Sequence, residues 1–238
     1  FASPLLLADI SAARDGDLAR IKTIGIVAAM GDQLELANVG FTVFGNSRGT
    51  VDISDWKLDD DVAATVGGLL KGRYEIVVIT GFDKARFRPT GPGFFGAQID
   101  EEDETKALAA RADAPRVDAY LLIYPLFNVN PMSFNNQWLT GPGLYRERSR
   151  EAIYALGVAT LVDARTFDRI GSKWLSLKSD DPEMGNDFPF RRVQGVVPET
   201  YEAMTPEQKR QAATIMKEAV FYGVRCGLIH PGFTDTPM

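Results

Sequence analysis

The apolar and polar positions begin with two extended runs on either side of a tight-turn signal. The runs are "KTIGIVAAM" and "QLELANVGFTVFG", and the pair Gly31 and Asp32 lies between them. Gly-Asp pairs favour the short turns of β-hairpins, so the pattern predicts an opening hairpin whose second strand continues to Gly45. In the following stretch, "LDDDVAATVGGLLKG", apolar residues recur at helical spacing behind three aspartates. Negative charge is favourable at a helix N-terminus, which supports a helix there.

Two short, continuous apolar runs come next, "YEIVVIT" and "VDAYLLIY". Runs of this kind are typical of strands covered on both faces. Between them, "DEEDETKALAARADA" has an acidic start followed by alanine-rich turns, as a helix would. The order strand, helix, strand predicts a parallel crossover.

The most informative segment is 151–178, "EAIYALGVATLVDARTFDRIGSKWLSLK". Its alternation places bulky side chains on one face of a strand and mostly small ones, including Gly157 and Ala159, on the other. "RTFDR" then turns the chain into a second strand, which predicts a long hairpin. Near the end of the chain, "TPEQ" is a capping box, so a helix over 205–225 is expected to pack on the small face of this hairpin.

These elements predict a mixed α/β fold. We expect one mixed-sheet α/β sandwich over residues 21–238, with a β-hairpin start, a central long hairpin and a C-terminal packing helix. Residues 1–20 are interpreted as an N-terminal arm and a possible remnant of a secretory signal. Three stretches lack a regular pattern, 81–99, 125–150 and 179–197. Loops of this length are uncommon in compact domains and tend to be functional or mobile.

Composition narrows the classes of function. The net charge is −6, and the sequence contains no basic run interleaved with aromatics. Nucleic acid and anionic membrane surfaces are therefore not expected partners. Cys226 is the only cysteine, which excludes an internal disulfide and a cysteine-based metal cluster within one chain. No apolar stretch is long enough to span a bilayer. No cofactor is expected, and "SDDPEMGND" is interpreted as an exposed acidic loop because its spacing does not match an EF-hand.

Two motifs point to enzymes. "HPGFTDTPM" is similar to a turn of the short-chain dehydrogenases, but the chain lacks their glycine-rich turn and has no lysine four residues after a tyrosine. A Rossmann-type oxidoreductase is therefore disfavoured. "GNSRG" matches the nucleophile elbow of α/β-hydrolases, and Ser47 and His230 stand in the order of their triad. The elbow needs a helix directly after the serine, whereas "TVDIS" alternates like a strand. A serine hydrolase that uses Ser47 and His230 remains the alternative.

The first two irregular stretches, 81–99 and 125–150, are rich in aromatic residues. Both follow strands that we expect to be parallel, and loops of this kind rise from the carboxyl edge of the sheet, where α/β folds usually bind ligands. The sequence thus predicts a shared site for a ligand or protein partner, with some of its rings partly exposed around a groove. The candidate residues are Phe94, Phe95, Phe127, Phe134, Trp138 and Tyr145.

A resemblance to a family is carried by "VDAYLLIY", "GLYRERSR" and "AIYALGVATLVDARTFDRIGSKW". This series is similar to the periplasmic α/β domain of curli-secretion-type and related bacterial envelope lipoproteins. It departs from them at Phe167, where a glycine is usual, and it has no cysteine near the N-terminus for a lipid anchor. The opening "GIVAAMGD" and "VGFTVFGN" resemble exported proteobacterial proteins of unknown function.

The resemblance implies a non-catalytic domain that binds or assembles in the bacterial cell envelope. A periplasmic or secreted location is expected, with a cytoplasmic one as the alternative. The partner would be a protein or a small molecule of the envelope, and the resemblance supplies no catalytic residues.

Overall fold

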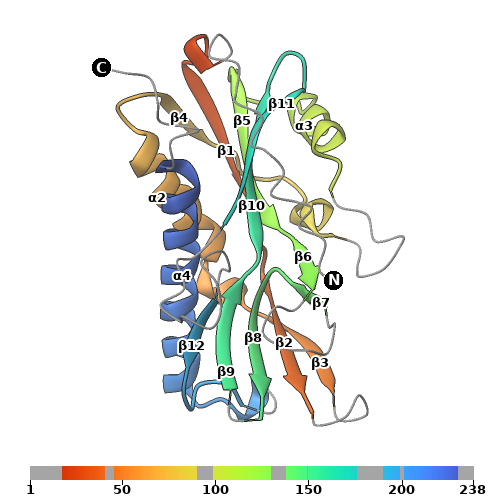
Figure 1. The fold of residues 1–238 in the computed structure, drawn as a ribbon. Coiled ribbons are helices and arrows are strands. Elements are labelled where there is room, and N and C mark those ends of the chain that lie inside the picture. The colour runs from red at the N-terminus through yellow and green to blue at the C-terminus, as the bar shows by residue number, and fades with distance from the viewer. Residues whose placement is uncertain are drawn as a thin grey trace, which may run out of the picture.

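Two five-stranded sheets organise the computed structural model, which describes residues 18–40, 46–89, 99–129, 138–148, 150–175, 190–198 and 201–229. The upper sheet of Figure 1 has the strand order β11 (Arg169–Trp174), β10 (Gly157–Asp163), β5 (Ala119–Pro125), β1 (Thr23–Ala28) and β4 (Glu75–Val78). The lower sheet has the order β12 (Phe190–Val193), β9 (Arg150–Ala155), β8 (Pro142–Glu147), β2 (Gln33–Val39) and β3 (Ser47–Asp52). A small pair, β6 (Phe127–Val129) and β7 (Trp138–Thr140), completes the strands of the described ranges.

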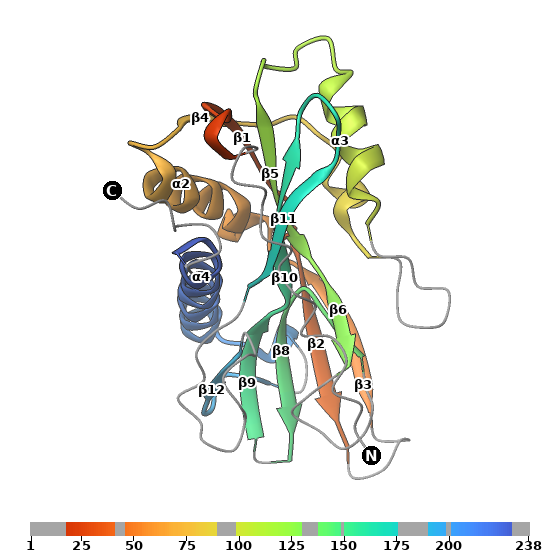
Figure 2. The ribbon, with the colours of Figure 1, turned by 45° about the horizontal axis from the view of Figure 1, so that its top comes forward.

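Helices cover both faces of the upper sheet (Figures 1 and 2). On one face, α2 (Leu58–Leu70) contacts β1 and β4, and α4 (Pro206–Ile229) contacts α2, β9 and β11. On the other face, α3 (Glu101–Ala109) contacts β10. Short 3-10 helices lie at Ser54–Trp56, Lys84–Phe87 and Tyr201–Ala203. The mixed α/β class is therefore confirmed, but with two mixed sheets where one was expected.

The core is divided by the upper sheet. The larger apolar cluster joins α2 and α4 to both sheets through residues such as Val62, Met216, Ile26 and Ile153. A second cluster joins α3 to the opposite face through Leu108, and it includes Phe87, Leu122 and Tyr124. Burial on both faces explains why the β5 sequence is apolar throughout.

The predicted opening hairpin is wrong. The runs on either side of Gly31 are strands, but β1 lies in the upper sheet between β4 and β5, parallel to both. β2 lies in the lower sheet, parallel to β8 and antiparallel to β3. Gly31 has φ +100°, a conformation that glycine adopts easily, and there the chain passes from one sheet to the other. A glycine turn signal says that the chain changes direction, and not which strands pair.

The predicted crossover is confirmed in its direction, since β4 and β5 are both parallel to β1. The two strands are not neighbours, because β1 lies between them. β4 is an edge strand with exposed ends, unlike the strand covered on both faces that its sequence predicts.

The expected central hairpin is divided between the two sheets. Its first strand bends at Leu156, so that β9 belongs to the lower sheet and β10 to the upper sheet, where β10 and β11 form the predicted hairpin. Three chain segments are tied together at the bend. Leu126 N donates to Leu156 O at 3.1 Å, Leu156 N to Gly141 O at 2.9 Å, and Gly141 N to Leu126 O at 2.8 Å. This ring of backbone hydrogen bonds lies where the two sheets diverge.

The C-terminal helix is confirmed together with its capping box. Gln208 N donates to Thr205 Oγ1 at 3.2 Å, and Thr205 N donates to Gln208 Oε1 at 2.9 Å. α4 packs on the face of β9 that carries Ile153 and Ala155, through Ala212 and Met216. Gly157 lies on the same face, but a Cβ atom built there would be 2.8 Å from the side chains of Met30 and Leu175. Its small size is therefore needed at the bend between the sheets.

The prediction of three long irregular loops is partly wrong. Within 125–150 the chain forms β6, β7 and β8, although Pro142 and Gly143 in β8 have low strand propensity. Within 81–99 the described part holds the 3-10 helix Lys84–Phe87, and within 179–197 the described part holds β12. The remaining residues of these stretches lie outside the described ranges.

Most of the expected N-terminal arm also lies outside those ranges. Its last residues belong to the fold, since Leu18 packs against the larger core cluster and Arg20 forms an ion pair with Asp163. No helix in the described ranges is long and apolar enough to cross a membrane.

Candidate functional site

The predicted aromatic site is described at three of its positions. Phe127 and Trp138 lie on the β6–β7 pair, which we call the aromatic hairpin (Phe127–Val129 and Trp138–Thr140). Their rings meet edge to face, with centroids 5.3 Å apart and planes at 62°. Phe127 is buried, whereas Trp138 is partly exposed. Phe94, Phe95 and Phe134 lie outside the described residues.

Tyr145 lies apart from these two rings. It lies in β8, in the lower sheet, and is 1% exposed within a small apolar cluster. Its hydroxyl donates to Glu147 at 2.9 Å. Tyr145 is therefore not one of the partly exposed rings, because the segment that carries it is a central strand and not the expected loop.

A buried glutamate fastens the aromatic hairpin to the lower sheet. Glu35 Oε2 accepts a hydrogen bond of 2.6 Å from Thr140 N in β7 and another of 2.6 Å from the Tyr154 hydroxyl. Arg48 on the edge strand β3 lies 3.5 Å from Glu35 Oε1. One carboxylate thus joins β2, β3, β7 and β9, and it fixes the backbone two residues from Trp138.

Gly143 makes this network possible. In the lower sheet Glu35 is paired with Gly143, and Gly143 is paired with Tyr154 on the next strand. The Tyr154 ring crosses over the glycine to reach Glu35, since a Cβ atom on Gly143 would lie 2.1 Å from the ring. Burial raises the pKa of the Tyr154 hydroxyl well above its usual value, and the Glu35 charge adds to this. Tyr154 therefore stays protonated and serves as a donor.

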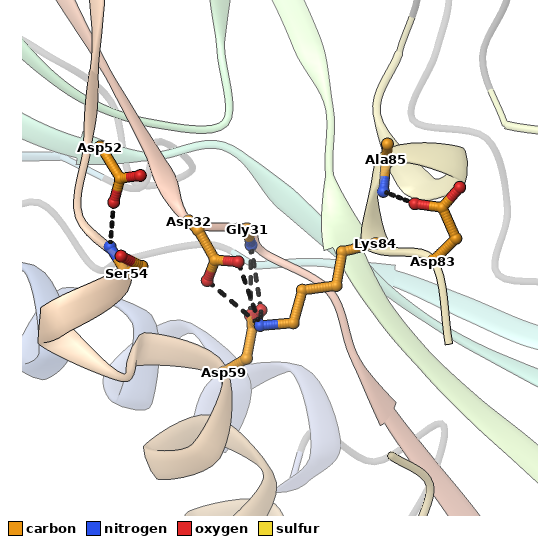
Figure 3. A network of polar contacts seen from close by, with 8 residues as sticks. All are labelled: Gly31, Asp32, Asp52, Ser54, Asp59, Asp83, Lys84 and Ala85. Carbon is orange, nitrogen blue, oxygen red and sulfur yellow. Dashed lines mark hydrogen bonds and ion pairs between the residues drawn. The ribbon is translucent and has the colours of Figure 1, made fainter. Parts of the chain in front are cut away.

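A second polar cluster occupies the carboxyl end of β1 (Figure 3). Asp59, in the first turn of α2, is 4% exposed and accepts from Gly31 N at 3.2 Å. Lys84, which follows β4, lies 2.9 Å from Asp59 and 3.1 Å from Asp32. This is the edge of the sheet at which a ligand site was expected, and an internal ion pair occupies it.

The protonation states of this pair follow from burial and contact. Desolvation raises the pKa of Asp59, and Lys84 and the Gly31 N–H offset only part of that increase. Partial desolvation acts to lower the pKa of Lys84, but the contacts with Asp59 and then Asp32 outweigh it, so the pKa is raised. Lys84 thus remains a cation and serves as a bridge between the loops after β1 and β4.

A third cluster lies under α3 and was missed in the sequence. Glu101 is buried, and its carboxylate accepts from Thr160 Oγ1 at 2.9 Å, from Arg169 Nε at 2.6 Å and from the Tyr124 hydroxyl. Ser172 lies 3.1 Å from Thr160. In the sequence, Glu101 is indistinguishable from the three acidic residues that follow it at the helix start. Only the packing of α3 on the sheet singles it out.

The hydrolase motif does not have the expected local geometry. Ser47 is the exposed first residue of β3 and is followed by a strand, so the sharp strand-to-helix turn of a nucleophile elbow is not formed there. His230 lies outside the described residues, as do the acidic loop "SDDPEMGND" and the closing "HPGFTDTPM". No group of metal-ligating side chains is found in the described ranges.

Comparisons with known proteins give little further information. No protein family matches the chain, and no curated protein matches it. Among solved structures, it is similar to protein XCC0632 of Xanthomonas campestris, of the DUF330 family, with a TM-score of 0.36 and 10% sequence identity. The alignment covers 87% of this chain and 82% of that one. The resemblance to curli-secretion-type lipoproteins is not shown by these comparisons and stays a prediction.

Proposed function

We propose that this chain is a non-catalytic domain that binds or assembles partners in the bacterial cell envelope, in the periplasm or after secretion. The aromatic hairpin is the observation that carries the proposal. Trp138 is partly exposed on top of the buried ring of Phe127, and Glu35 holds the hairpin in place through Thr140 N. Tryptophan is enriched at binding hot spots because it supplies a large contact area at low cost in conformational entropy.

The anchoring of the hairpin favours binding because it restricts the ring before a partner arrives. The three paired positions of β6 and β7 and the edge-to-face packing on Phe127 limit the positions open to Trp138. A side chain that is already ordered loses less freedom on association, which leaves more of the contact energy for affinity.

The acidic clusters support a non-catalytic role. Each of the buried carboxylates of Glu35, Asp59 and Glu101 is engaged by a donor or a cation from another element of the fold. Catalytic acids and bases are placed to reach a substrate, whereas these groups hold secondary-structure elements together. The proposed location in the cell envelope rests on the sequence resemblance to envelope lipoproteins and exported proteins. The net charge of −6 disfavours nucleic acid as the partner.

Site-specific photo-crosslinking tests the binding proposal. Benzoylphenylalanine is placed at position 138 in one variant and at position 174 in a matched control, because Trp174 is also a surface tryptophan, 54% exposed. Adducts with an envelope component are expected from position 138 and not from position 174. The adduct is identified by mass spectrometry, and its purified component is then titrated with the Trp138→Ala and Trp174→Ala variants.

The expected result is a loss of affinity of about tenfold or more for Trp138→Ala, with the Trp174→Ala variant close to the original chain. Equal losses in both variants, or no adduct from position 138, would contradict the role of the hairpin. Osmotic-shock fractionation of cells that express the natural gene tests the location, which the proposal places outside the inner membrane.

The serine hydrolase alternative has its own test. The purified chain is treated with a fluorophosphonate probe beside its Ser47→Ala variant. We expect no labelling of either protein, and likewise no change in the fluorescence of NADH or NADPH. Labelling that disappears in the Ser47→Ala variant would replace the binding proposal with a hydrolase.

A further inference from the structure

The outer rim of the lower sheet is formed by β3, which pairs only with β2 within the part of the chain that the structure describes. Figures 1 and 2 both place β3 at the edge of that sheet. Its residues are exposed except for the half-buried Val51. The free side of an edge strand presents a row of backbone N–H and C=O groups, which can pair with another strand.

We infer that β3 pairs antiparallel with β3 of a second copy of this chain, about a two-fold axis at Thr50. Two-fold dimers are the commonest assemblies, and their interfaces bring the same patch of each subunit together. Along a strand, backbone groups of alternate residues point outward. In an antiparallel pair, two opposed residues both point these groups toward the partner strand or both point them away. When two copies of the same strand pair, the numbers of opposed residues are therefore both odd or both even. Axes at Gly49, Thr50 and Val51 satisfy this condition.

Charge selects the axis at Thr50. In that register Arg48 of each copy lies opposite Asp52 of the other, so two pairs of opposite charge form by symmetry. Thr50 meets itself, and Gly49 meets Val51. Opposite charges and threonine pairs placed directly across two strands are favourable contacts. An axis at Gly49 would instead oppose Arg48 with Thr50 and leave Asp52 beyond the strand.

The contacts already made by these residues are compatible with the pairing. Arg48 Nη1 lies 3.5 Å from Glu35 Oε1 of the same copy. A guanidinium has five N–H donors, so it can contact a second carboxylate at the same time. Asp52 accepts from Ser54 N at 2.8 Å through Oδ1, and a carboxylate can accept several hydrogen bonds at once. Charged residues on an edge strand often discourage pairing. Two charges of opposite sign, placed symmetrically about Thr50, favour one antiparallel register instead.

The dimer would join two five-stranded lower sheets into one continuous sheet. The aromatic hairpin has no part in the pairing, so this inference and the proposed function can fail separately.

Disulfide trapping tests the register. In a Cys226→Ala background, which removes the chain's only cysteine, Thr50→Cys is compared with Ser47→Cys on the same exposed strand. Thr50 opposes itself across the axis, whereas Ser47 opposes Ile53. Mild oxidation is therefore expected to give a covalent dimer for Thr50→Cys and far less for Ser47→Cys on a non-reducing gel. No dimer from Thr50→Cys, or equal dimer from both, overturns the inference.

Charge reversal followed by rescue tests the pairing of Arg48 with Asp52. By sedimentation equilibrium, Asp52→Arg is expected to raise the dimer dissociation constant by about tenfold or more, because two unlike pairs become like pairs. Adding Arg48→Asp should restore most of the affinity. Asp55→Arg, which makes the same charge change just beyond β3, is the control, and circular dichroism checks that each variant is folded. A monomer at every concentration, an equal effect of Asp55→Arg, or absence of rescue by a folded double variant overturns the inference.

Discussion

Glu35 in the lower sheet and Glu101 beside the upper sheet are held by nearly the same set of partners. Each buried carboxylate accepts from a tyrosine on a central strand and meets an arginine on an edge strand. The tyrosines are Tyr154 and Tyr124, and the arginines are Arg48 and Arg169. A third donor differs, since Thr140 N completes the Glu35 cluster and the Thr160 hydroxyl completes the Glu101 cluster.

The difference lies in what each carboxylate holds. Glu101 is the first residue of α3, so its cluster fixes a helix to the sheet. Glu35 lies within a strand, and its cluster fixes the aromatic hairpin. One arrangement of side chains thus serves two purposes in the same fold. The lower cluster is the one through which a mutation would reach the proposed binding surface.

The largest effect is expected from Gly143→Ala, which breaks the lower cluster sterically. The new Cβ atom would lie 2.1 Å from the Tyr154 ring, so the ring must leave Glu35 or the strands must separate. We expect a loss of about 3 kcal/mol or more in the free energy of unfolding, measured by urea denaturation. Gly68→Ala is the control, because nothing lies near its Cβ position and alanine favours a helix. Equal stability of the two variants would contradict this account.

Removing Glu35 in one variant and Glu101 in another compares the two clusters directly. Glu35→Ala and Glu101→Ala each leave a tyrosine hydroxyl without its acceptor, and each should cost about 2–4 kcal/mol. Hydrogen exchange followed residue by residue distinguishes them. Glu35→Ala should speed exchange at the Thr140 amide and leave α3 protected, whereas Glu101→Ala should do the reverse. If both variants deprotect the same segment, the two clusters are not independent.

Overpacking of the bend between the sheets should have an intermediate effect. In Gly157→Leu the side chain would meet Met30 and Leu175, whose atoms are already 2.8 Å from a Cβ atom at that position. The expected loss is about 1–3 kcal/mol, seen as a lower melting temperature. Ala159→Leu, on the same face of β10, tests whether overpacking in the upper sheet costs as much. Unchanged melting of both variants would refute the packing described here.

A smaller effect separates strain from packing in the turn after β10. Phe167 has φ +63°, a conformation that costs residues other than glycine roughly 1–2 kcal/mol, and its ring lies 5.9 Å from the Lys106 ammonium of α3. Phe167→Ala removes the ring and keeps the strain, whereas Phe167→Gly removes both. The glycine variant should therefore be more stable than the alanine variant by about 1 kcal/mol in thermal unfolding. The opposite order would show that the turn is unstrained.

The elements of the fold could be predicted where the signal was local. The helices α2, α3 and α4 follow from apolar spacing, acidic starts and the Thr205–Gln208 capping box. The division into two sheets could not be predicted, because the Gly31 turn and the Leu156 bend look the same locally whether the flanking strands pair or separate. The role of Glu35 could not be predicted either. Gly143 and Tyr154 are far from Glu35 in the sequence, and only the pairing of their strands brings them to it.

The smallest effect concerns pH and Asp118, a carboxylate just before β5 that contacts the start of β1. Asp118 accepts hydrogen bonds from Thr23 N at 3.0 Å and Lys22 N at 2.9 Å. These two bonds, of which that from Thr23 has the larger effect, hold the pKa of Asp118 below the usual 3.8. A carboxylate with a lowered pKa in the folded state adds stability above the unfolded pKa, and this is lost as the pH falls through the folded value. Asp59 has a raised pKa, so its contribution has the opposite sign. Urea unfolding should show Asp118→Asn less stable than the original chain at pH 6.5, with a gap that narrows below pH ~4. A gap that is constant with pH would show that the Asp118 charge does not stabilise the start of β1.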